Sequence, residues 1–151
     1  MSDIQFNWSR LEQLSGPQFH DIIAHRERVF IVEQNCPFQD ADQYDAHSWH
    51  LIGRVDGQLA AYLRITDAGH KFAEACIGRV LTASEFRGQS FGIALMQEAL
   101  NGMHQQFSKQ ANRIGAQSYL LKFYGSFGFV VVGDEYLEDG IPHFEMLRPA
   151  D

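Results

Sequence analysis

A strand that runs through a loop of small residues into a long helix is the feature that most constrains the fold of this chain. The segment Arg79–Leu95 reads RVLTASEFRGQSFGIAL, and an apolar stripe at 3.6-residue spacing continues it. The stripe is formed by Met96, Ala99, Leu100, Met103 and Phe107. Several backbone N–H groups of such a loop can point at one anion, and the helix N-terminus adds a partial positive charge. Together with the full charge of Arg87, the segment predicts a pyrophosphate site.

Other phosphate loops and a plain turn are the alternatives to this interpretation. The Gly-Lys-Ser/Thr ending of a P-loop is absent, and so is the third glycine of a dinucleotide fingerprint. An ordinary glycine-containing turn between a strand and a helix fits the spacing equally well. The loop alone therefore does not decide between a cofactor site and a turn.

The flanking segments predict one α/β domain over residues 1–151, with a mixed sheet rather than a doubly wound one. Ser15 can cap a helix whose first turn suits Pro17, and that helix should run to about Val32. Alternating apolar residues on both sides of Asp56-Gly57 predict a hairpin. The expected order is β-α-β-β-β-α-β-α-β-β. Strands are expected at 4–8, 49–55, 59–65, 75–81, 114–117, 130–132 and 143–147. A loop is expected at 36–45, a long helix after the turn 84–90 and a short helix at 120–127.

The composition excludes several classes of protein. A formal net charge of −7 argues against DNA or RNA as the main partner and is compatible with a cationic amine substrate. Cys36 and Cys76 are far apart in the sequence, so neither a disulfide framework nor a zinc site is expected. No apolar run approaches the roughly 20 residues of a membrane span, and the N-terminus lacks a signal pattern. A cytoplasmic location without membrane contact is the expectation.

A second motif, Phe123-Tyr124…Gly128-Phe129, lies downstream of the loop and one strand away from it. Arg87-x-x-Ser90-x-Gly92 resembles the Arg/Gln-x-x-Gly-x-Gly/Ala acyl-CoA loop of the GNAT (N-acetyltransferase) superfamily, and the second motif resembles its C-terminal Phe-Tyr-x-x-x-Gly-Phe. Further likeness at residues 29–40, 77–80 and 138–143 indicates the ElaA-type branch, so the resemblance covers nearly the whole chain. Ser90 stands where the family has a glycine, and it must tolerate the dihedral that the glycine adopts.

The resemblance implies the GNAT acyl-CoA N-acyltransferase fold, with a central, mostly antiparallel sheet flanked by helices. It also implies that a primary amine, on a small molecule or a peptide, attacks the thioester of acetyl-CoA or another acyl-CoA directly, without a metal. Whether the chain forms a homodimer is left open. The residues implied to bind acyl-CoA are Val80, Leu81, Thr82, Arg87, Gly88, Gln89, Ser90, Phe91, Gly92, Ala94, Gln117 and Tyr124.

Three chemical roles in this reaction need groups from the protein. Backbone N–H groups of residues 80–82 can polarise the thioester carbonyl if that strand splays from its neighbour. Tyr124, at the position of the superfamily's tyrosine, can protonate the departing thiolate, and a buried core tyrosine is the alternative. The sequence does not fix the base for the ammonium nucleophile: Glu33 is one candidate, and a chain of water molecules is an alternative to a side chain. The other candidates for the base are Asp42, Asp45, His50 and His143.

The acidic cluster Asp40-x-Asp42-x-x-Asp45 also has a purely structural interpretation. Loop aspartates commonly cap turns or pair with arginines, and three arginines are available for pairing. These are Arg26, Arg64 and Arg79. The glycine and final glutamate of a calcium loop are absent, and His47-x-x-His50 lies in a strand-like context, so no metal is expected.

Two other functions remain open at this point. Acyl-homoserine-lactone synthases share the fold, and their N-terminal pattern resembles Arg26-x-x-Val29-Phe30, Asp42-Gln43-Tyr44-Asp45 and Arg64. A non-catalytic acyl-CoA-binding or protein-interaction module would bind CoA without any need for Tyr124. The loop at 87–92 and the aromatic motif favour an N-acetyltransferase over both.

Overall fold

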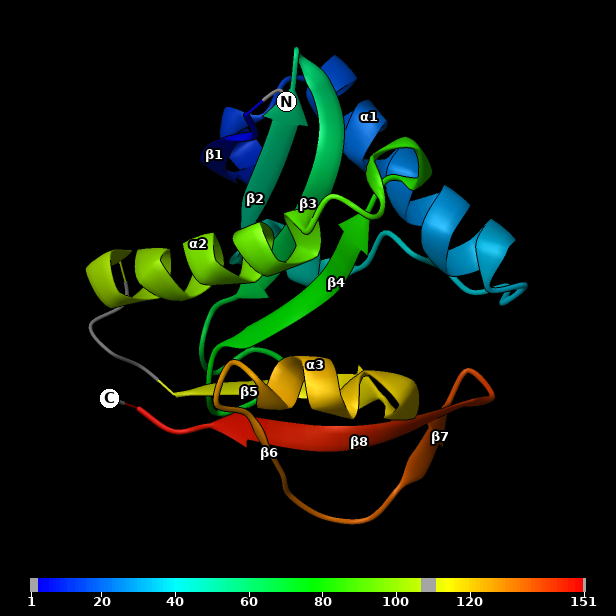
Figure 1. The fold of residues 1–151 in the computed structure, drawn as a ribbon, viewed down its shortest axis with the longest axis vertical. Helices are drawn as coiled ribbons and strands as arrows, with labels where there is room; N and C mark the ends of the chain where they lie inside the picture. Colours follow the sequence, from blue (N-terminus) through cyan, green and yellow to red (C-terminus); the bar gives the residue numbers. More distant parts are fainter. Residues whose placement is uncertain (1–2, 107–110, 151) are drawn as a thin grey trace.

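Two antiparallel sheets form the framework of the protein (Figure 1). The structure, a computed structural model, describes residues 3–106 and 111–150. The N-terminal sheet has the order β1-β2-β3-β4, and its strands are β1 (Gln5–Arg10), β2 (Ser48–Val55), β3 (Gln58–Thr66) and β4 (Cys76–Thr82). The C-terminal sheet is built around β8 (Ile141–Arg148). This strand pairs with β5 (Asn112–Gln117), β6 (Val130–Val131) and β7 (Tyr136–Glu138).

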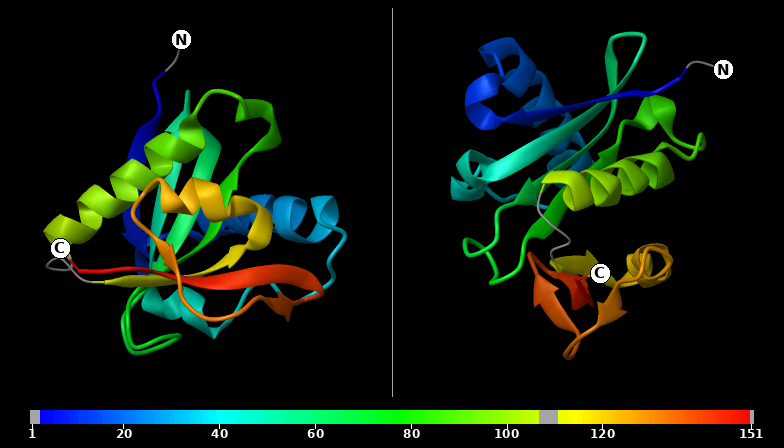
Figure 2. Two further views of the ribbon diagram at one scale, coloured as in Figure 1. Left: turned by 60° about the horizontal axis from the view of Figure 1, so that its bottom comes forward. Right: turned by 90° about the vertical axis from the view of Figure 1, so that its left-hand side faces the viewer.

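The two sheets touch at the start of β4 and β5 and then diverge. A single parallel bridge joins Ala75 to Asn112, where the N–H of Arg113 donates to the carbonyl of Ala75 over 2.9 Å. The Asn112 side chain accepts a hydrogen bond from the N–H of Ile77 over 3.1 Å. Within the described residues, no ladder continues between the two strands beyond this point. Figures 1 and 2 show β4 rising away from β5 and β8, so the sheet splays where the sequence analysis requires it to.

Helices cover both faces of the N-terminal sheet (Figure 2). On one face α2 (Phe91–Gln106) packs against β3 and β4; on the other lies α1 (Gly16–Arg26), which continues as a π-helix, η2 (Glu27–Glu33). The predicted helix thus ends within one residue of Val32, but its last seven residues are wound more widely. The remaining helix, α3 (Leu121–Gly125), covers the C-terminal sheet, and short 3-10 turns η1, η3, η4 and η5 occupy Leu11–Gln13, Gln43–His47, Ser84–Phe86 and Ser118–Leu120.

The apolar core follows this layering in two clusters. The larger lies between α2, the N-terminal sheet and α3, and Met96 and Ala99 of the predicted stripe are fully buried in it. Leu100 packs at its border, whereas Phe107 falls outside the described residues. The smaller cluster joins α1 to the opposite face and contains Ile22, Ile52, Leu59, Tyr62 and Leu81. None of the described helices has the length and apolar character needed to cross a membrane.

Two hairpins have the same two-residue turn, and only one of them was predicted. Asp56 and Gly57 have φ angles of 51° and 80°, and Val55 pairs with Gln58, which confirms the hairpin of β2 and β3. Asp139 and Gly140 repeat this geometry with φ angles of 51° and 77°. They join β7 to β8, and β7 is missing from the predicted order.

Candidate functional site

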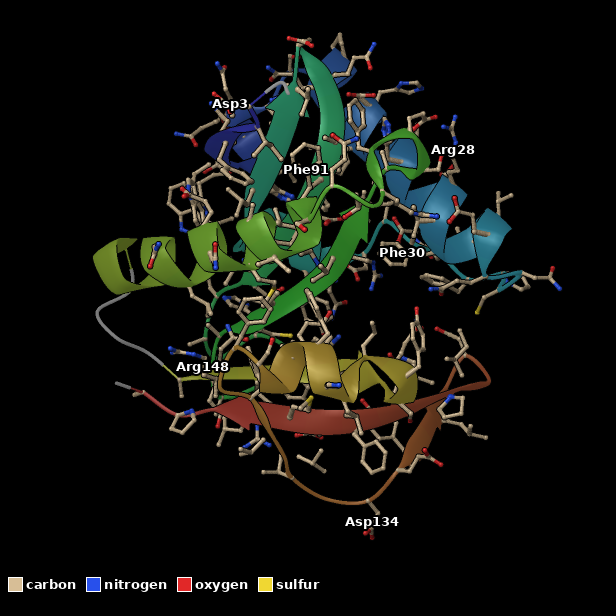
Figure 3. The ribbon with its side chains drawn as sticks, in the orientation of Figure 1. Asp3, Arg28, Phe30, Phe91, Asp134 and Arg148 are labelled. Atoms are coloured by element: carbon tan, nitrogen blue, oxygen red, sulfur yellow. The ribbon has the colours of Figure 1, made fainter. Side chains whose placement is uncertain are left out.

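A cavity of about 810 Å³ lies where β4 and β5 diverge. Its walls come from η2, β4, β5, α3 and the β7–β8 hairpin, so both sheets contribute to it. Phe30 of η2 lies beside the end of β4, and Phe91 marks the start of α2 (Figure 3). A smaller cavity of about 210 Å³ adjoins Thr82 and is lined by the loop that precedes α2. The two predicted motifs therefore meet at one place in the fold.

The loop before α2 has the backbone geometry of an anion cradle. Gly88 and Ser90 both lie in the left-handed region, with φ angles of 82° and 62°. The N–H of Ala94 donates to the carbonyl of Ser90 over 3.2 Å, so the N–H groups of residues 91–93 precede the first intrahelical bond. These N–H groups and the helix dipole face the smaller cavity, an arrangement that fits a pyrophosphate. Ser90 thus adopts a left-handed conformation, which favours glycine over other residues.

Other predicted acyl-CoA residues lie around the cradle at different depths. A Cβ at Gly92 would lie 3.7 Å from Thr82 Oγ1, an ordinary contact distance, so the start of α2 lies beside the end of β4. Gln89 is exposed and Ala94 half-buried. Gln117, at the end of β5, lines the large cavity and donates from Nε2 to Gln34 Oε1 over 3.3 Å.

Arg87 and Glu33, which the sequence analysis placed in different roles, form an ion pair. Arg87 Nη2 lies 2.8 Å from Glu33 Oε1, and Arg87 Nε donates to the carbonyl of Thr82 over 3.1 Å. The pair ties the cradle to η2 across the mouth of the large cavity. Both side chains remain partly exposed, at 47% for Arg87 and 33% for Glu33, so a competing anion can reach the guanidinium.

A bulge in β4 turns its backbone toward the cavity. Arg79 has a φ angle of 51°, and the register with β3 shifts between Tyr62 and Arg64. Beyond the bulge, the N–H of Ala83 donates to the carbonyl of Ala60 in the sheet. Because donors alternate along a strand, the N–H groups of Val80 and Thr82 point away from β3 and into the splay. The side chain of Leu81, in contrast, is buried in the smaller core cluster.

Tyr124 of α3 lines the large cavity from the face that carries the core. Its ring packs edge-on against Phe123 and Phe129, and only 7% of the residue is exposed. Burial raises the pKa of the phenol well above its usual range, so the hydroxyl keeps its proton at neutral pH. Gly128, with a φ angle of 93°, ends the turn and lets the N–H of Phe129 return to the carbonyl of Tyr124. The aromatic motif is therefore one compact unit that fixes the phenol.

The acidic cluster is a buried ionic network of three carboxylates and three guanidinium groups. Arg26 binds Asp40 and Asp45, each over 2.7 Å, while Arg64 binds Asp42 over 2.6 Å and Asp45 over 2.9 Å. Arg79 completes it, with 2.8 Å to Asp40 and 3.3 Å to Asp42. This pairing is the structural alternative that the sequence analysis kept open.

The network contains equal numbers of carboxylates and guanidinium groups, and the guanidinium groups keep the carboxylates ionised. Burial by itself raises the pKa of Asp42, but hydrogen bonds and charge from Arg64, with the charge of Arg79, lower it on balance. In the same way, Arg26 and Arg64 outweigh burial and lower the pKa of Asp45. Both groups are therefore carboxylates at neutral pH and weak proton acceptors.

The two histidines proposed as bases occupy different environments. His50 is fully buried, away from the cavity lining, and its ring nitrogens contact the Tyr62 hydroxyl at 2.7 Å and the carbonyl of Asp45 at 3.0 Å. Burial lowers the pKa of His50, so the ring is neutral. His143, on β8, lines the large cavity together with Glu138. The hairpin that brings Glu138 there was not predicted, although Asp139-Gly140 signals it.

Comparison with known proteins gives consistent matches along the chain. The family model for the acetyltransferase (GNAT) domain matches residues 23–148. The UPF0039 protein sll0451 of Synechocystis is 38% identical over 146 residues, which cover 96% of this chain and 95% of that protein. ElaA of Escherichia coli is 38% identical over 138 residues, 90% of each chain, and its crystal structure matches with a TM-score of 0.89. An acyl-CoA N-acyltransferase from Pseudomonas aeruginosa has a TM-score of 0.91 at 36% identity, over 97% of this chain and 99% of that chain.

Proposed function

This chain belongs to the ElaA-type branch of the GNAT acyltransferase superfamily, and we propose that it transfers an acetyl group from acetyl-CoA to a primary amine. The amine belongs to a small molecule or a peptide and attacks the thioester directly. One observation supports this proposal above the others: the anion cradle at Gly88–Gly92 opens beside the splay of β4 and β5, next to a cavity of about 810 Å³. A bound thioester and an acceptor both find room there.

The chain supplies suitable groups for the two events at the thioester. The N–H groups of Val80 and Thr82 point into the splay and can donate to the carbonyl oxygen as it gains negative charge. The Tyr124 hydroxyl, protonated at neutral pH, can give its proton to the departing sulfur. Acyl-CoA itself supplies the activated acyl group.

Residues that resemble acyl-homoserine-lactone synthases have another explanation in this fold. Arg26, Asp42, Asp45 and Arg64 bind one another in the buried network and so hold β3, α1 and the loop before η3 together. We therefore favour no second function. A binding module without catalysis remains distinguishable by experiment, because it would retain acyl-CoA affinity and show no turnover.

The decisive experiment is a panel of amines assayed by release of the CoA thiol from acetyl-CoA. We expect turnover with at least one alkylamine or peptide amine, and acetyl-CoA should raise the melting temperature, as any ligand of the native state does. A melting temperature that ignores millimolar acetyl-CoA contradicts the proposal. So does activity confined to anionic acceptors.

A further inference from the structure

The three carboxylates that are candidates for the base all bind arginine already. Glu33 pairs with Arg87, Asp42 with Arg64 and Arg79, and Asp45 with Arg26 and Arg64. A carboxylate held by a guanidinium is a poor proton acceptor, since accepting a proton breaks the pair. His50 is also engaged at both ring nitrogens.

His143 differs from these groups because, within the described residues, only one of its two ring nitrogens makes a hydrogen bond. Its Nδ1 lies 2.7 Å from the carbonyl oxygen of Ile141. A carbonyl can only accept, so Nδ1 carries the hydrogen and donates it. In the neutral ring Nε2 then holds a lone pair, and His143 lines the cavity. The tautomer that the backbone enforces is the one that a base needs.

A carboxylate next to His143 is placed to stabilise the protonated ring. Nε2 lies 3.5 Å from Glu138 Oε2, and Tyr136 stacks on the imidazole with a centroid distance of 5.8 Å. A carboxylate attracts Nε2 only when this nitrogen carries a proton, because it cannot donate to a lone pair. The negative charge of Glu138 therefore lies beside the nitrogen that would take up the proton.

The side chains of His143 and Tyr124 reach the cavity from opposite faces of the C-terminal sheet. His143 pairs with Gln117 across the β5–β8 ladder, so these two share a face. Ile114 lies three positions from Gln117, and Met146 lies three positions from His143, so both point to the opposite face of the sheet. That face packs in the same core cluster as Tyr124. An amine can therefore approach from the His143 side while the thiol leaves toward Tyr124.

We propose that His143 is the general base for the acceptor amine, with Glu138 as its positioning residue; this rests on the proposed function. The ammonium gives one proton to Nε2, and the neutral amine then forms the C–N bond as the C–S bond breaks. The nitrogen gives a second proton to solvent. Tyr124 protonates the sulfur and takes up a proton from solvent in its place. His143 releases its proton to solvent, so each turnover releases one proton in total.

Proton transfer to His143 requires the neutral ring, so the pH profile of the activity should contain an acid limb that depends on this residue. Tyr136 stacks on this ring, Glu138 lies 3.5 Å from its Nε2, and Glu145 lies on the same face of β8, where it binds Arg113 over 2.7 Å. Cys76 of β4 lines the same cavity. Burial raises the pKa of the Cys76 thiol to about 11, and burial also raises that of Tyr136, so both are uncharged at neutral pH. Among these groups, the carboxylate of Glu138 is the charge that lies beside Nε2.

The test compares His143→Gln with the parent and with His20→Gln, a substitution of an exposed histidine on α1. With an alkylamine at pH 7, kcat/KM should fall by about 10²–10⁴ in His143→Gln. With hydroxylamine, which is neutral at this pH and needs no deprotonation before attack, the loss should stay below about tenfold. Glu138→Gln should show a smaller loss with the alkylamine, about tenfold, and His20→Gln none.

Three further measurements separate a base from a residue that merely supports the fold. Acetyl-CoA should raise the melting temperature of His143→Gln as much as that of the parent. Imidazole added to His143→Ala should restore part of the alkylamine activity, and the acid limb of the pH profile should disappear in His143→Gln.

Several outcomes would overturn the assignment. Parent-like activity of His143→Gln would mean that His143 has no role in the reaction. Equal losses with both kinds of amine, or loss of the thermal shift caused by acetyl-CoA, would mean that its role is structural. A large loss in Glu33→Gln with an active His143→Gln gives the base role to Glu33. A parent that releases no CoA with any amine refutes the proposed function instead, and so the two failures are distinct.

Discussion

The acyl-CoA side and the acceptor side of the cavity are built by different means. The cradle at residues 88–92 is contiguous in the sequence and uses backbone N–H groups, a left-handed loop and a helix N-terminus. The acceptor side uses side chains from η2, β4 and the β7–β8 hairpin, which are distant in the sequence. A backbone site needs only the local chain path, whereas a side-chain site needs the whole fold to bring its groups together.

The ionic network shows how the acceptor side is kept in place. It joins α1, β3, the bulge in β4 and the loop before η3 through charges that are almost entirely shielded from water. Arg79 belongs both to the network and to the bulge that turns β4 toward the cavity. Damage to the network should therefore affect stability and the acceptor side first, and the cradle least.

The largest expected effect is that of Asp45→Ala, which leaves Arg26 and Arg64 with one carboxylate each. Removing one partner of a buried ion pair costs about 3–5 kcal/mol, because the remaining charge stays buried. Urea unfolding should show this loss. Arg10→Ala, which breaks the half-exposed pair with Asp67, is the control and should cost about 1 kcal/mol or less. Equal losses in both variants would contradict the role of the network.

The contribution of this network should also depend on pH. The pKa values of Asp42 and Asp45 are lower in the folded protein than in the unfolded chain, where the pKa of an aspartate is about 3.9. The two carboxylates therefore stabilise the fold above the unfolded-state pKa, and this contribution is lost as the pH falls through the folded-state pKa values. The difference in unfolding free energy between the parent and Asp45→Ala should accordingly shrink below about pH 4. A difference that stays constant down to pH 2 would exclude this linkage.

Tyr124→Phe should give the next largest effect and tests the acyl-CoA side at the thioester. The ring that packs on Phe123 and Phe129 is kept, so folding and acetyl-CoA affinity should barely change. The value of kcat should fall by about 10²–10⁴, near the lower end because CoA thiolate leaves tolerably without a proton. KM for acetyl-CoA should stay within a few fold. Unchanged kcat, with chemistry shown to be rate-limiting, would return Tyr124 to a packing role.

Arg87→Glu tests the charge of the cradle and should act on affinity rather than on stability. A charged hydrogen bond is worth about 1.5–3 kcal/mol, so the reversed charge should weaken acetyl-CoA binding by at least tenfold and remove most of its thermal shift. Arg28→Glu is the matched control, because its exposed pair with Glu85 lies outside both cavity linings. A shift of parental size in Arg87→Glu would mean that the backbone alone holds the pyrophosphate.

The contrast between the two sides also explains what the sequence could predict. The cradle, the splay and the aromatic motif follow from contiguous residues and from the family resemblance, and the fold they imply is the one observed. The pairing of Glu33 with Arg87 depends on how η2 meets the loop in space, which no spacing encodes.

Two local features were missed for identifiable reasons. Three residues are too few to show alternation, so β7 left no strand pattern, although the Asp139-Gly140 turn could have revealed it. The π-helix η2 keeps the apolar spacing of a helix, and for that reason its wider winding is invisible in the sequence. Both features line the acceptor side, where prediction was weakest.

The smallest expected effect is that of Ser90→Gly, which restores the glycine typical of the family. Ser90 has a φ angle of 62°, a region that costs a non-glycine residue roughly 1 kcal/mol. Glycine removes this strain but adds conformational entropy to the unfolded chain, so the net gain in unfolding free energy should be only about 0.5 kcal/mol. Gly88→Ala, at a φ angle of 82° with open space around its Cβ, is the reciprocal control and should destabilise by a similar or larger amount. If Ser90→Gly instead lowers the stability, the serine hydroxyl holds the loop by a contact of its own, and the cradle is then less purely a backbone site than its geometry indicates.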